Sequence, residues 1–326
     1  MAYSADIVAR ARRQLESAKA DKESQYQQHL LQAYRQEPRL REIDMLLRKS
    51  MALAAQAVFT QGGDARAAME RVKEANLALQ RERQALIDSR FALGYLDDAP
   101  ICSGCGGSGY IGTNMCRCLG ELCRKEQKKE LALLSTGEES FENFRLDYYS
   151  AQVDSRYGAS PRMIMERNLK FCRKFAESFD GTGNLLFVGG TGLGKTFLSA
   201  CIADAVTDRG FSVAYESAPN LFAKLEKNRF SPDDQSRVEA AKFAACDLLI
   251  IDDLGTEMPG SFVTAALYSL LNDRLLSRKG MLISTNLNVE EAAKRYSPQI
   301  ASRLQGSFKG LTFVGEDIRV LKNRGY

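Results

Sequence analysis

Residues 189–196 of this chain are Gly189, Gly190, Thr191, Gly192, Leu193, Gly194, Lys195 and Thr196. This stretch fits G-x-x-x-x-G-K-[ST], the pattern of the phosphate-binding P-loop. Its glycines let the backbone turn tightly with no side chain in the way, so that its N–H groups converge on an anion at a helix N-terminus. The motif directs the Lys195 ammonium at the β- and γ-phosphates and offers the Thr196 hydroxyl to Mg²⁺. We therefore predict an ATP site here.

The sequence on both sides of this loop supplies the context that the motif requires. Residues 184–188, Asn-Leu-Leu-Phe-Val, predict a buried strand before the loop. Residues 197–208 predict a helix after it, which Arg209 and Gly210 end as a basic last turn and a glycine cap. Phe197 opens this helix and is counted among the nucleotide-binding positions. The alternative is a glycine-rich turn that fits the pattern by chance.

A second apolar run, residues 247–253, ends in two adjacent carboxylates, Asp252 and Asp253. After a P-loop, a buried strand with this ending is typical of the acidic residue that holds Mg²⁺ through water, which we assign to Asp252. Asp253, one residue further on, is placed to orient or deprotonate the attacking water. Residues 281–286 predict another buried strand, and its last residue, Asn286, is expected to hold that water near the γ-phosphate. In both cases the alternative is a buried strand with a polar end.

Composition sets the broad class of the protein. The 326 residues are enough for two domains, and 44% hydrophobic with 26% charged residues is typical of a soluble globular chain. The net charge of +4 permits nucleic acid as a partner but does not argue for it. The sequence has no apolar run of transmembrane length and no signal-peptide core. A cytoplasmic protein with no membrane contact is expected.

Five of the eight cysteines crowd into a short, glycine-rich stretch. Cys102 and Cys105 form a C-x-x-C pair, and Cys116 and Cys118 form a C-x-C pair ten residues later. Two such pairs on tight turns can bring four thiolates to one tetrahedral Zn²⁺, and four cysteines leave no open position, so the zinc would be structural. Cys123 is an alternative to Cys118 as the fourth ligand. A cluster of free thiols is the alternative to a metal site.

The first 95 residues carry three stripes of apolar side chains at three- and four-residue steps, as amphipathic helices do. Pro38 separates the first two stripes, and residues 61–63, Gln-Gly-Gly, end the second before a helix that Asp64 is expected to cap. A helical hairpin or three-helix bundle is predicted. It is either self-contained or, because so small a bundle buries little core, a docking module for another protein.

These motifs, together with the Ser-Thr-Asn strand tip and residues 300–304, Ile-Ala-Ser-Arg-Leu, resemble AAA+ ATPases of the DnaC/DnaI bacterial helicase-loader family. The resemblance covers residues 140–326, and the cysteine knuckle is similar to that of loaders from Gram-positive bacteria and their phages. It implies that Asn286 is sensor 1. It also implies that Arg303 is an arginine finger acting on a neighbour's ATP, and hence an ATP-dependent homo-oligomer. The alternative for Arg303 is a carboxylate partner in its own subunit.

The same resemblance implies that the helices at residues 219–245 line a channel for single-stranded DNA. Side chains there that suit phosphate contacts or base stacking are Lys224, Lys227, Arg229, Arg237, Phe222 and Phe230. Ordinary exposed charges on solvated helices are the alternative.

Two features depart from the family pattern. Asp253 stands where most AAA+ proteins have Glu, which suggests a weaker base. Only 23 residues follow Arg303, too few for the usual helical lid, and Arg319 is assigned as a truncated sensor.

We therefore expect an α/β protein with a P-loop AAA+ core, a parallel sheet between helices with its lid missing or truncated. The expected segments are a helical partner-binding module (1–95), a zinc ribbon (96–125), a linker (126–160) and the ATPase domain (161–326). The expected function is ATP-dependent loading of a replicative DNA helicase onto single-stranded DNA, with ATP, Mg²⁺ and Zn²⁺ as cofactors and weak ATPase activity alone. The alternatives are an IstB-like transposition helper, which shares the core, and an ATP-switched DNA-binding adaptor with little turnover.

Overall fold

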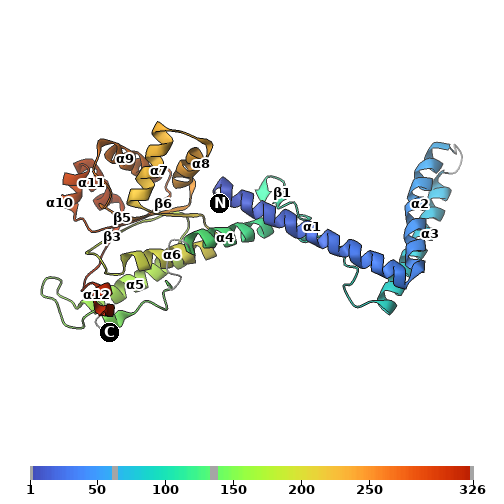
Figure 1. Ribbon diagram of the computed structural model, residues 1–326, viewed down its shortest axis with the longest axis horizontal. Coiled ribbons are helices and arrows are strands. Elements are labelled where there is room, and N and C mark those ends of the chain that lie inside the picture. The colour runs from blue at the N-terminus through green and yellow to red at the C-terminus, as the bar shows by residue number, and fades with distance from the viewer. Residues whose placement is uncertain (1–2, 61–64, 133–138, 324–326) are drawn as a thin grey trace. The chain divides into compact units, whose positions relative to one another are not determined.

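A computed structural model describes the chain over residues 3–60, 65–132 and 139–323 (Figure 1). It has two compact units, one of residues 14–114 and one that joins residues 1–13 to residues 115–326. The helix stop and cap predicted at residues 61–64 lie outside the described residues, as do the side chains of residues 51–69 and 132. The segment boundaries predicted from the sequence stay predictions.

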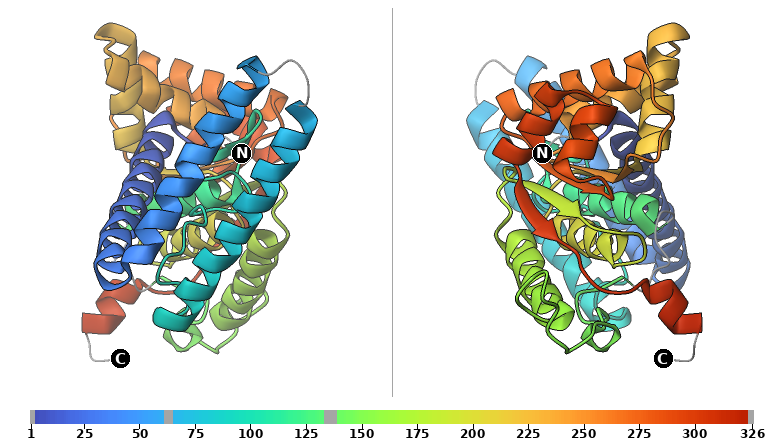
Figure 2. Two further views of the ribbon diagram at one scale, coloured as in Figure 1. Left: turned by 90° about the vertical axis from the view of Figure 1, so that its right-hand side faces the viewer. Right: turned by 90° about the vertical axis from the view of Figure 1, so that its left-hand side faces the viewer.

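Long helices make up the smaller unit, as predicted. They are α1 (Ala5–Gln36, from residue 14 on), α2 (Pro38–Thr60) and α3 (Ala65–Arg90). α2 and α3 lie side by side (Figure 2). Asp44 on α2 pairs with Arg83 on α3 at 2.8 Å and accepts a hydrogen bond from Tyr34 on α1 at 2.6 Å. This shared carboxylate ties the three helices together.

Five parallel strands form the sheet of the larger unit, in the order β4-β5-β6-β3-β7. They are β3 (Asn184–Val188), β4 (Val213–Ser217), β5 (Leu248–Leu254), β6 (Gly280–Thr285) and β7 (Lys309–Thr312). β3, β5 and β6 match the strands predicted at residues 184–188, 247–253 and 281–286, because strands buried on both faces are continuous apolar runs. β7 is not predicted from the sequence. It lies at the edge of the sheet and buries only Leu311, so no apolar run marks it.

Helices cover both faces of this sheet, so the predicted α/β P-loop fold is confirmed (Figure 1). The helices are α5 (Pro161–Ser178), α6 (Lys195–Asp208), α7 (Ala218–Phe230), α8 (Asp234–Ala245), α9 (Ser261–Leu276), α10 (Val289–Arg295), α11 (Pro298–Ser307) and α12 (Ile318–Asn323). On β5, Leu248 and Ile250 pack toward α5 and α6, while Leu249 and Ile251 pack toward α7, α8, α9 and α11. Smaller elements are β1 (Tyr110–Ile111), β2 (Asn114–Met115), α4 (Arg117–Ala132) and the 3₁₀ turn Leu146–Tyr148.

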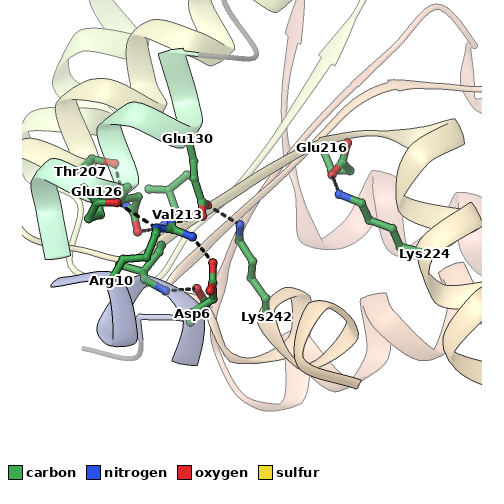
Figure 3. Close-up of polar contacts among 12 residues, drawn as sticks. Asp6, Arg10, Glu126, Glu130, Thr207, Val213, Glu216, Lys224 and Lys242 are labelled. Atoms are coloured by element: carbon green, nitrogen blue, oxygen red, sulfur yellow. Dashed lines mark hydrogen bonds and ion pairs between the residues drawn. The ribbon is translucent and has the colours of Figure 1, made fainter. Parts of the chain in front are cut away.

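Within the larger unit, polar contacts hold α4 to α1, α6 and α8 (Figure 3). The buried Gln127 side chain donates a hydrogen bond to the Thr207 hydroxyl on α6 at 2.8 Å. Glu130 pairs with Arg10 on α1 at 2.5 Å and with Lys242 on α8 at 2.8 Å. One carboxylate near the end of α4 thus joins the start of α1 to a helix of the sheet domain.

Arg274 on α9 is the largest fully buried side chain of the described residues, with 1% of its surface exposed. Its Nη1 donates to the carbonyl oxygens of Phe243 at 2.8 Å and Cys246 at 3.1 Å, and its Nη2 donates to that of Gly280 at 2.6 Å. These carbonyls lie at the end of α8 and the start of β6. A single guanidinium therefore supplies buried donors to backbone groups that would otherwise lack them.

Replacing Arg274 by Ala is expected to lower the free energy of unfolding by about 3–5 kcal/mol, because several buried carbonyls lose their donor at once. Arg274→Lys should fall in between, since one ammonium cannot span the positions that the planar guanidinium reaches. The exposed Arg229→Ala on α7 is the control and should change stability by less than about 0.5 kcal/mol. Urea unfolding followed by circular dichroism measures all three. Equal midpoints for Arg274→Ala and Arg229→Ala would contradict the capping role.

Candidate nucleotide site and metal centre

The P-loop connects β3 to α6 and has the tight backbone that its glycines predict. Gly192 and Gly194 have φ of 69° and 87°, the left-handed region where a side chain is strained. A Cβ on Gly194 would lie 2.9 Å from the Tyr149 hydroxyl, and a Cβ on Gly189 would lie 2.4 Å from the Phe313 carbonyl oxygen. The loop is therefore closely packed from behind, and only glycine fits at these positions.

Lys195 lies inside the curve of this loop. Its side chain is 5% exposed, and its Nζ donates to the carbonyl oxygens of Gly189 at 2.8 Å and Gly190 at 2.6 Å. Burial lowers the pKa of the ammonium, against the opposing effect of nearby Asp253 and Asp252. A cation held this way is set to exchange loop carbonyls for phosphate oxygens.

Asp252 is the last of the consecutive buried residues 248–252 on β5 and is 7% exposed. One carboxylate oxygen, Oδ2, accepts hydrogen bonds from the hydroxyls of Thr196 at 2.8 Å and Tyr215 at 3.2 Å. The other, Oδ1, accepts from the Ser284 hydroxyl. The Thr196 hydroxyl and the Asp252 carboxylate are oxygen donors of the kind that Mg²⁺ takes together with water and substrate phosphates. The residues present therefore fit the predicted Mg²⁺.

Asp253 follows directly but is oriented differently. Its backbone is left-handed, with φ of 54°, and its side chain is exposed. Partial burial of the carboxylate and the charge of Asp252 raise its pKa, while Lys195 and Arg319 oppose this shift. Asp253 thus lies within electrostatic range of the phosphate-binding lysine. Arg319, at the start of α12, is within the same range.

Asn286 is exposed just beyond the carboxyl end of β6, the strand beside β5. Its Oδ1 would lie 3.3 Å from a Cβ placed on Gly255, directly after β5. The predicted sensor residue is therefore at the same edge of the sheet as Asp253. Its contact with a water or phosphate stays a prediction.

A pocket of about 890 Å³ opens beside the P-loop. Residues 147–162, the first half of the P-loop and residues 312–316 contribute to its lining. Tyr149, which is 1% exposed, donates a hydrogen bond from its hydroxyl to the Leu193 carbonyl at 3.0 Å and so joins this wall to the loop. The volume suits a nucleoside next to bound phosphates.

Several residues around the site are not found from the sequence. Tyr149 donates a hydrogen bond to the P-loop, and the hydroxyls of Tyr215 and Ser284 donate to Asp252. Asp317 lies directly beside Gly192, and the Gly192 carbonyl accepts a hydrogen bond from the Ile318 N–H at 2.9 Å. Tyr149, Tyr215 and Ser284 carry hydroxyls and Asp317 a carboxylate, and no sequence pattern identifies the partner of any of them.

Arg303 lies on α11, and its guanidinium stacks over the Tyr268 ring of α9 at 4.3 Å from the ring centre. It donates to the Tyr268 hydroxyl at 2.9 Å and to Asn272 Oδ1 at 3.3 Å. Over residues 3–60, 65–132 and 139–323 it has no ion pair with a carboxylate. A role toward a neighbouring subunit stays a prediction.

The predicted DNA contacts on α7 and α8 are mostly paired within the chain. Lys224 pairs with the buried Glu216 (Figure 3), and Lys227 pairs with Asp233 at 3.0 Å. Arg237 is near Asp234 at 3.7 Å, and Arg229 is exposed.

The prediction that DNA bases stack on Phe222 is wrong, because Phe222 is 3% exposed and lies on the face of α7 that packs on the sheet. Phe230, at the end of the same helix, is 66% exposed and packs against Phe262. Of the two predicted stacking residues, only Phe230 presents a ring to solvent.

The cysteine knuckle brings together Cys102, Cys105, Cys116 and Cys118, whose sulfur atoms all lie within 4.8 Å of one another. A tetrahedral zinc–thiolate site, with Zn–S bonds of about 2.3 Å, has sulfur–sulfur distances of about 3.8 Å. The Gly109 N–H also donates to the Cys105 sulfur at 3.3 Å. The four residues therefore fit Zn²⁺.

Cys123 is not in this cluster. It is fully buried, and burial together with nearby Glu126 raises the pKa of its thiol to about 11. A thiol that resists ionisation is a poor metal ligand. Of the two candidates for the fourth ligand, the structure brings Cys118 to the other three.

Residues 152–302 match the family described as IstB-like ATP binding protein. The chain is 25% identical over 168 residues to the replicative helicase loader DnaC of Escherichia coli (strain K12), which covers 51% of this chain and 62% of that protein. It is 32% identical over 103 residues to a putative insertion sequence ATP-binding protein of Sinorhizobium fredii, covering 32% of this chain and 34% of that one. The chain thus spans less than two thirds of these relatives.

The crystal structure of the DnaC helicase loader has a TM-score of 0.44 at 20% identity, over 53% of this chain and 98% of that one. None of the described helices combines the length and apolar character needed to span a bilayer. Residues 152–302 of the chain are thus similar to the IstB-like ATP-binding family, and the matched part of the chain resembles DnaC-type helicase loaders.

Proposed function

We propose that this protein uses ATP to load a replicative DNA helicase onto single-stranded DNA. The observation that carries the proposal is the assembled site at the edge of the sheet, where Lys195, Thr196, Asp252 and Asp253 meet. The similarity to DnaC over 168 residues supports the choice of loading among the uses of such a site.

In this proposal each residue has a defined task. The P-loop N–H groups and Lys195 hold the phosphates, and Thr196 and Asp252 hold Mg²⁺, directly and through water. Asp253 accepts a proton from the attacking water, and Asn286 keeps that water near the γ-phosphate. Arg303 of a neighbouring subunit stabilises charge on the γ-phosphate, which implies an ATP-dependent assembly.

A partner-binding role for the helical unit completes the proposal. Leu31, Leu46 and Leu77 are 60%, 44% and 42% exposed on its helices, where they can pack against another protein. Single-stranded DNA is proposed to bind at α7 and α8 through Arg229, Lys227 and Phe230. The Lys227 ion pair is exposed, so DNA phosphates can compete for it.

An IstB-like transposition helper is the second candidate, because the match at 32% identity is to an insertion sequence ATP-binding protein. The helical unit and the cysteine knuckle lie outside the family match at residues 152–302 and favour the loader. An adaptor that uses ATP only as a switch is the third reading, and it needs no water-activating Asp253.

Helicase transfer tests the function directly. The full chain should load the replicative helicase of the same genome onto circular single-stranded DNA only with ATP, with less DNA bound at higher salt. Leu31→Asp with Leu46→Asp should remove helicase co-elution but leave ATP binding intact, because both side chains are on the helical unit. Exposed Leu276→Asp, on α9, is the matched control. Failure to bind helicase, together with stimulation of a transposase, would favour the second candidate.

Asp253→Asn is expected to keep ATP binding and lower turnover by at least about 100-fold, since an amide cannot accept the proton. In the wild type, turnover should fall as the pH drops through the raised pKa of Asp253, at higher pH than for a freely exposed aspartate.

Lys195→Ala should instead lose ATP binding itself, and the exposed Lys170→Ala should change neither ATP binding nor turnover. Phosphate release and fluorescent-nucleotide titration separate these outcomes. An Asn variant as active as wild type would contradict the role of Asp253.

We also propose that the cysteine knuckle holds one structural Zn²⁺. Protein purified without chelator should contain one zinc per chain by elemental analysis, and Cys102→Ser should release it and loosen the knuckle, because a closed thiolate site contributes to folding. Cys123→Ser is the matched control and should keep the metal. Loss of zinc from the Cys123 variant, with retention in the Cys118 variant, would reverse the ligand assignment.

A further inference from the structure

The pairing of β5 with β6 is irregular where the two acidic residues lie. Ile251 pairs with Ile283, but the next pair is Leu254 with Thr285. Two residues of β5, Asp252 and Asp253, therefore stand opposite a single residue of β6, Ser284. An extra residue in one strand is a β-bulge, which bends the strand and redirects a side chain, and bulges are frequent beside active sites.

Ser284 fills the gap that this bulge leaves. Its side chain is completely buried. Its hydroxyl donates to Asp252 Oδ1 and accepts a hydrogen bond from the backbone N–H of Asp253 at 2.8 Å. The displaced N–H, which an unbroken ladder would pair with a strand carbonyl, is satisfied by this one side-chain oxygen.

The bulge determines where Asp253 points. Adjacent residues of a regular strand point to opposite faces of the sheet, so in a regular β5 the Asp253 side chain would point away from that of Asp252. Instead its φ is 54°, a conformation that in the described chain Arg278 alone shares among non-glycine residues. In this conformation its carboxylate stays within electrostatic range of both Asp252 and Lys195. Such strained backbone persists only where its surroundings hold it.

We propose that Ser284 is a positioning residue for ATP hydrolysis: by pinning the bulge it aims Asp253 at the water that attacks the γ-phosphate. Asp252 has two other hydroxyl partners, Thr196 and Tyr215, whereas the Asp253 N–H has Ser284. Removing the Ser284 hydroxyl therefore affects the direction of Asp253 more than the Mg²⁺ ligand. The proposal rests on the proposed ATPase activity.

Ser284→Ala, which removes only the hydroxyl, should lower kcat by about 100-fold, as misplacement of a catalytic group by about 1 Å does. The KM for ATP should change less than about threefold, because the P-loop is untouched. Ser199→Ala is the matched control. Ser199 is also a fully buried serine of this domain, on α6, and within the described part of the chain its hydroxyl has no hydrogen-bond partner. It should leave kcat and KM as in wild type.

A double variant separates positioning from general stability. If Ser284 acts through Asp253, adding Ser284→Ala to Asp253→Asn should lower kcat no further, because the group it aims is already lost. A further 100-fold loss in the double variant would overturn the proposal, as would an unchanged kcat in Ser284→Ala.

Crystal structures of wild type and Ser284→Ala give a readout that does not depend on turnover. Asp253 should leave the left-handed region in the variant while the P-loop keeps its shape. An Asp253 φ near its wild-type value in Ser284→Ala would overturn the pinning role. A wild-type protein that never hydrolyses ATP, with or without DNA and helicase, would instead refute the proposed function, and the two crystal structures would still decide the role of Ser284.

Discussion

Asp252 carries a buried carboxylate near the carboxyl end of the inner strand β5. A buried carboxylate is tolerated only where hydrogen-bond donors surround it. Its donors come from three different elements: Thr196 on α6, Tyr215 on β4 and Ser284 on β6. The strand order β4-β5-β6 is what places a hydroxyl on each side of it. The packing of the sheet and the geometry of the candidate nucleotide site therefore depend on each other, because a shift of either neighbouring strand would take one of its hydroxyl donors from the buried Asp252.

The P-loop depends in the same way on residues far from its motif. Tyr149 and Phe144 pack behind Gly194, and Phe313 packs behind Gly189. On the other side, Asp317 and the Ile318 N–H contact Gly192. The glycines thus serve two purposes: they permit the left-handed turns, and they let neighbouring segments approach the backbone closely. A loop held from both sides is pre-organised for phosphate before a nucleotide arrives.

The sequence predicts those parts of the molecule that leave a one-dimensional pattern. Apolar runs predict the three inner strands, and the cysteine spacing predicts a cluster that the structure does bring together. β7 escapes prediction because an edge strand buries little. The prediction for Phe222 places it on the wrong face of α7, because the charges on a helix do not show which side meets the sheet. Ser284 and Tyr215 could not be assigned, because their partner is fixed by strand order and register, which no local pattern encodes.

The bulge also bears on Asp253, the proposed base, which stands where most AAA+ proteins have Glu. By its length alone this shorter side chain would be a less effective base. Its backbone, however, is left-handed, and Asp is among the few residues that adopt this conformation with modest strain, since its short polar side chain can be accommodated locally. In the proposed arrangement the bulge aims Asp253 at the nucleotide, which shortens the distance that its side chain must cover. The left-handed backbone at the bulge is thus consistent with Asp, rather than a longer residue, at this position.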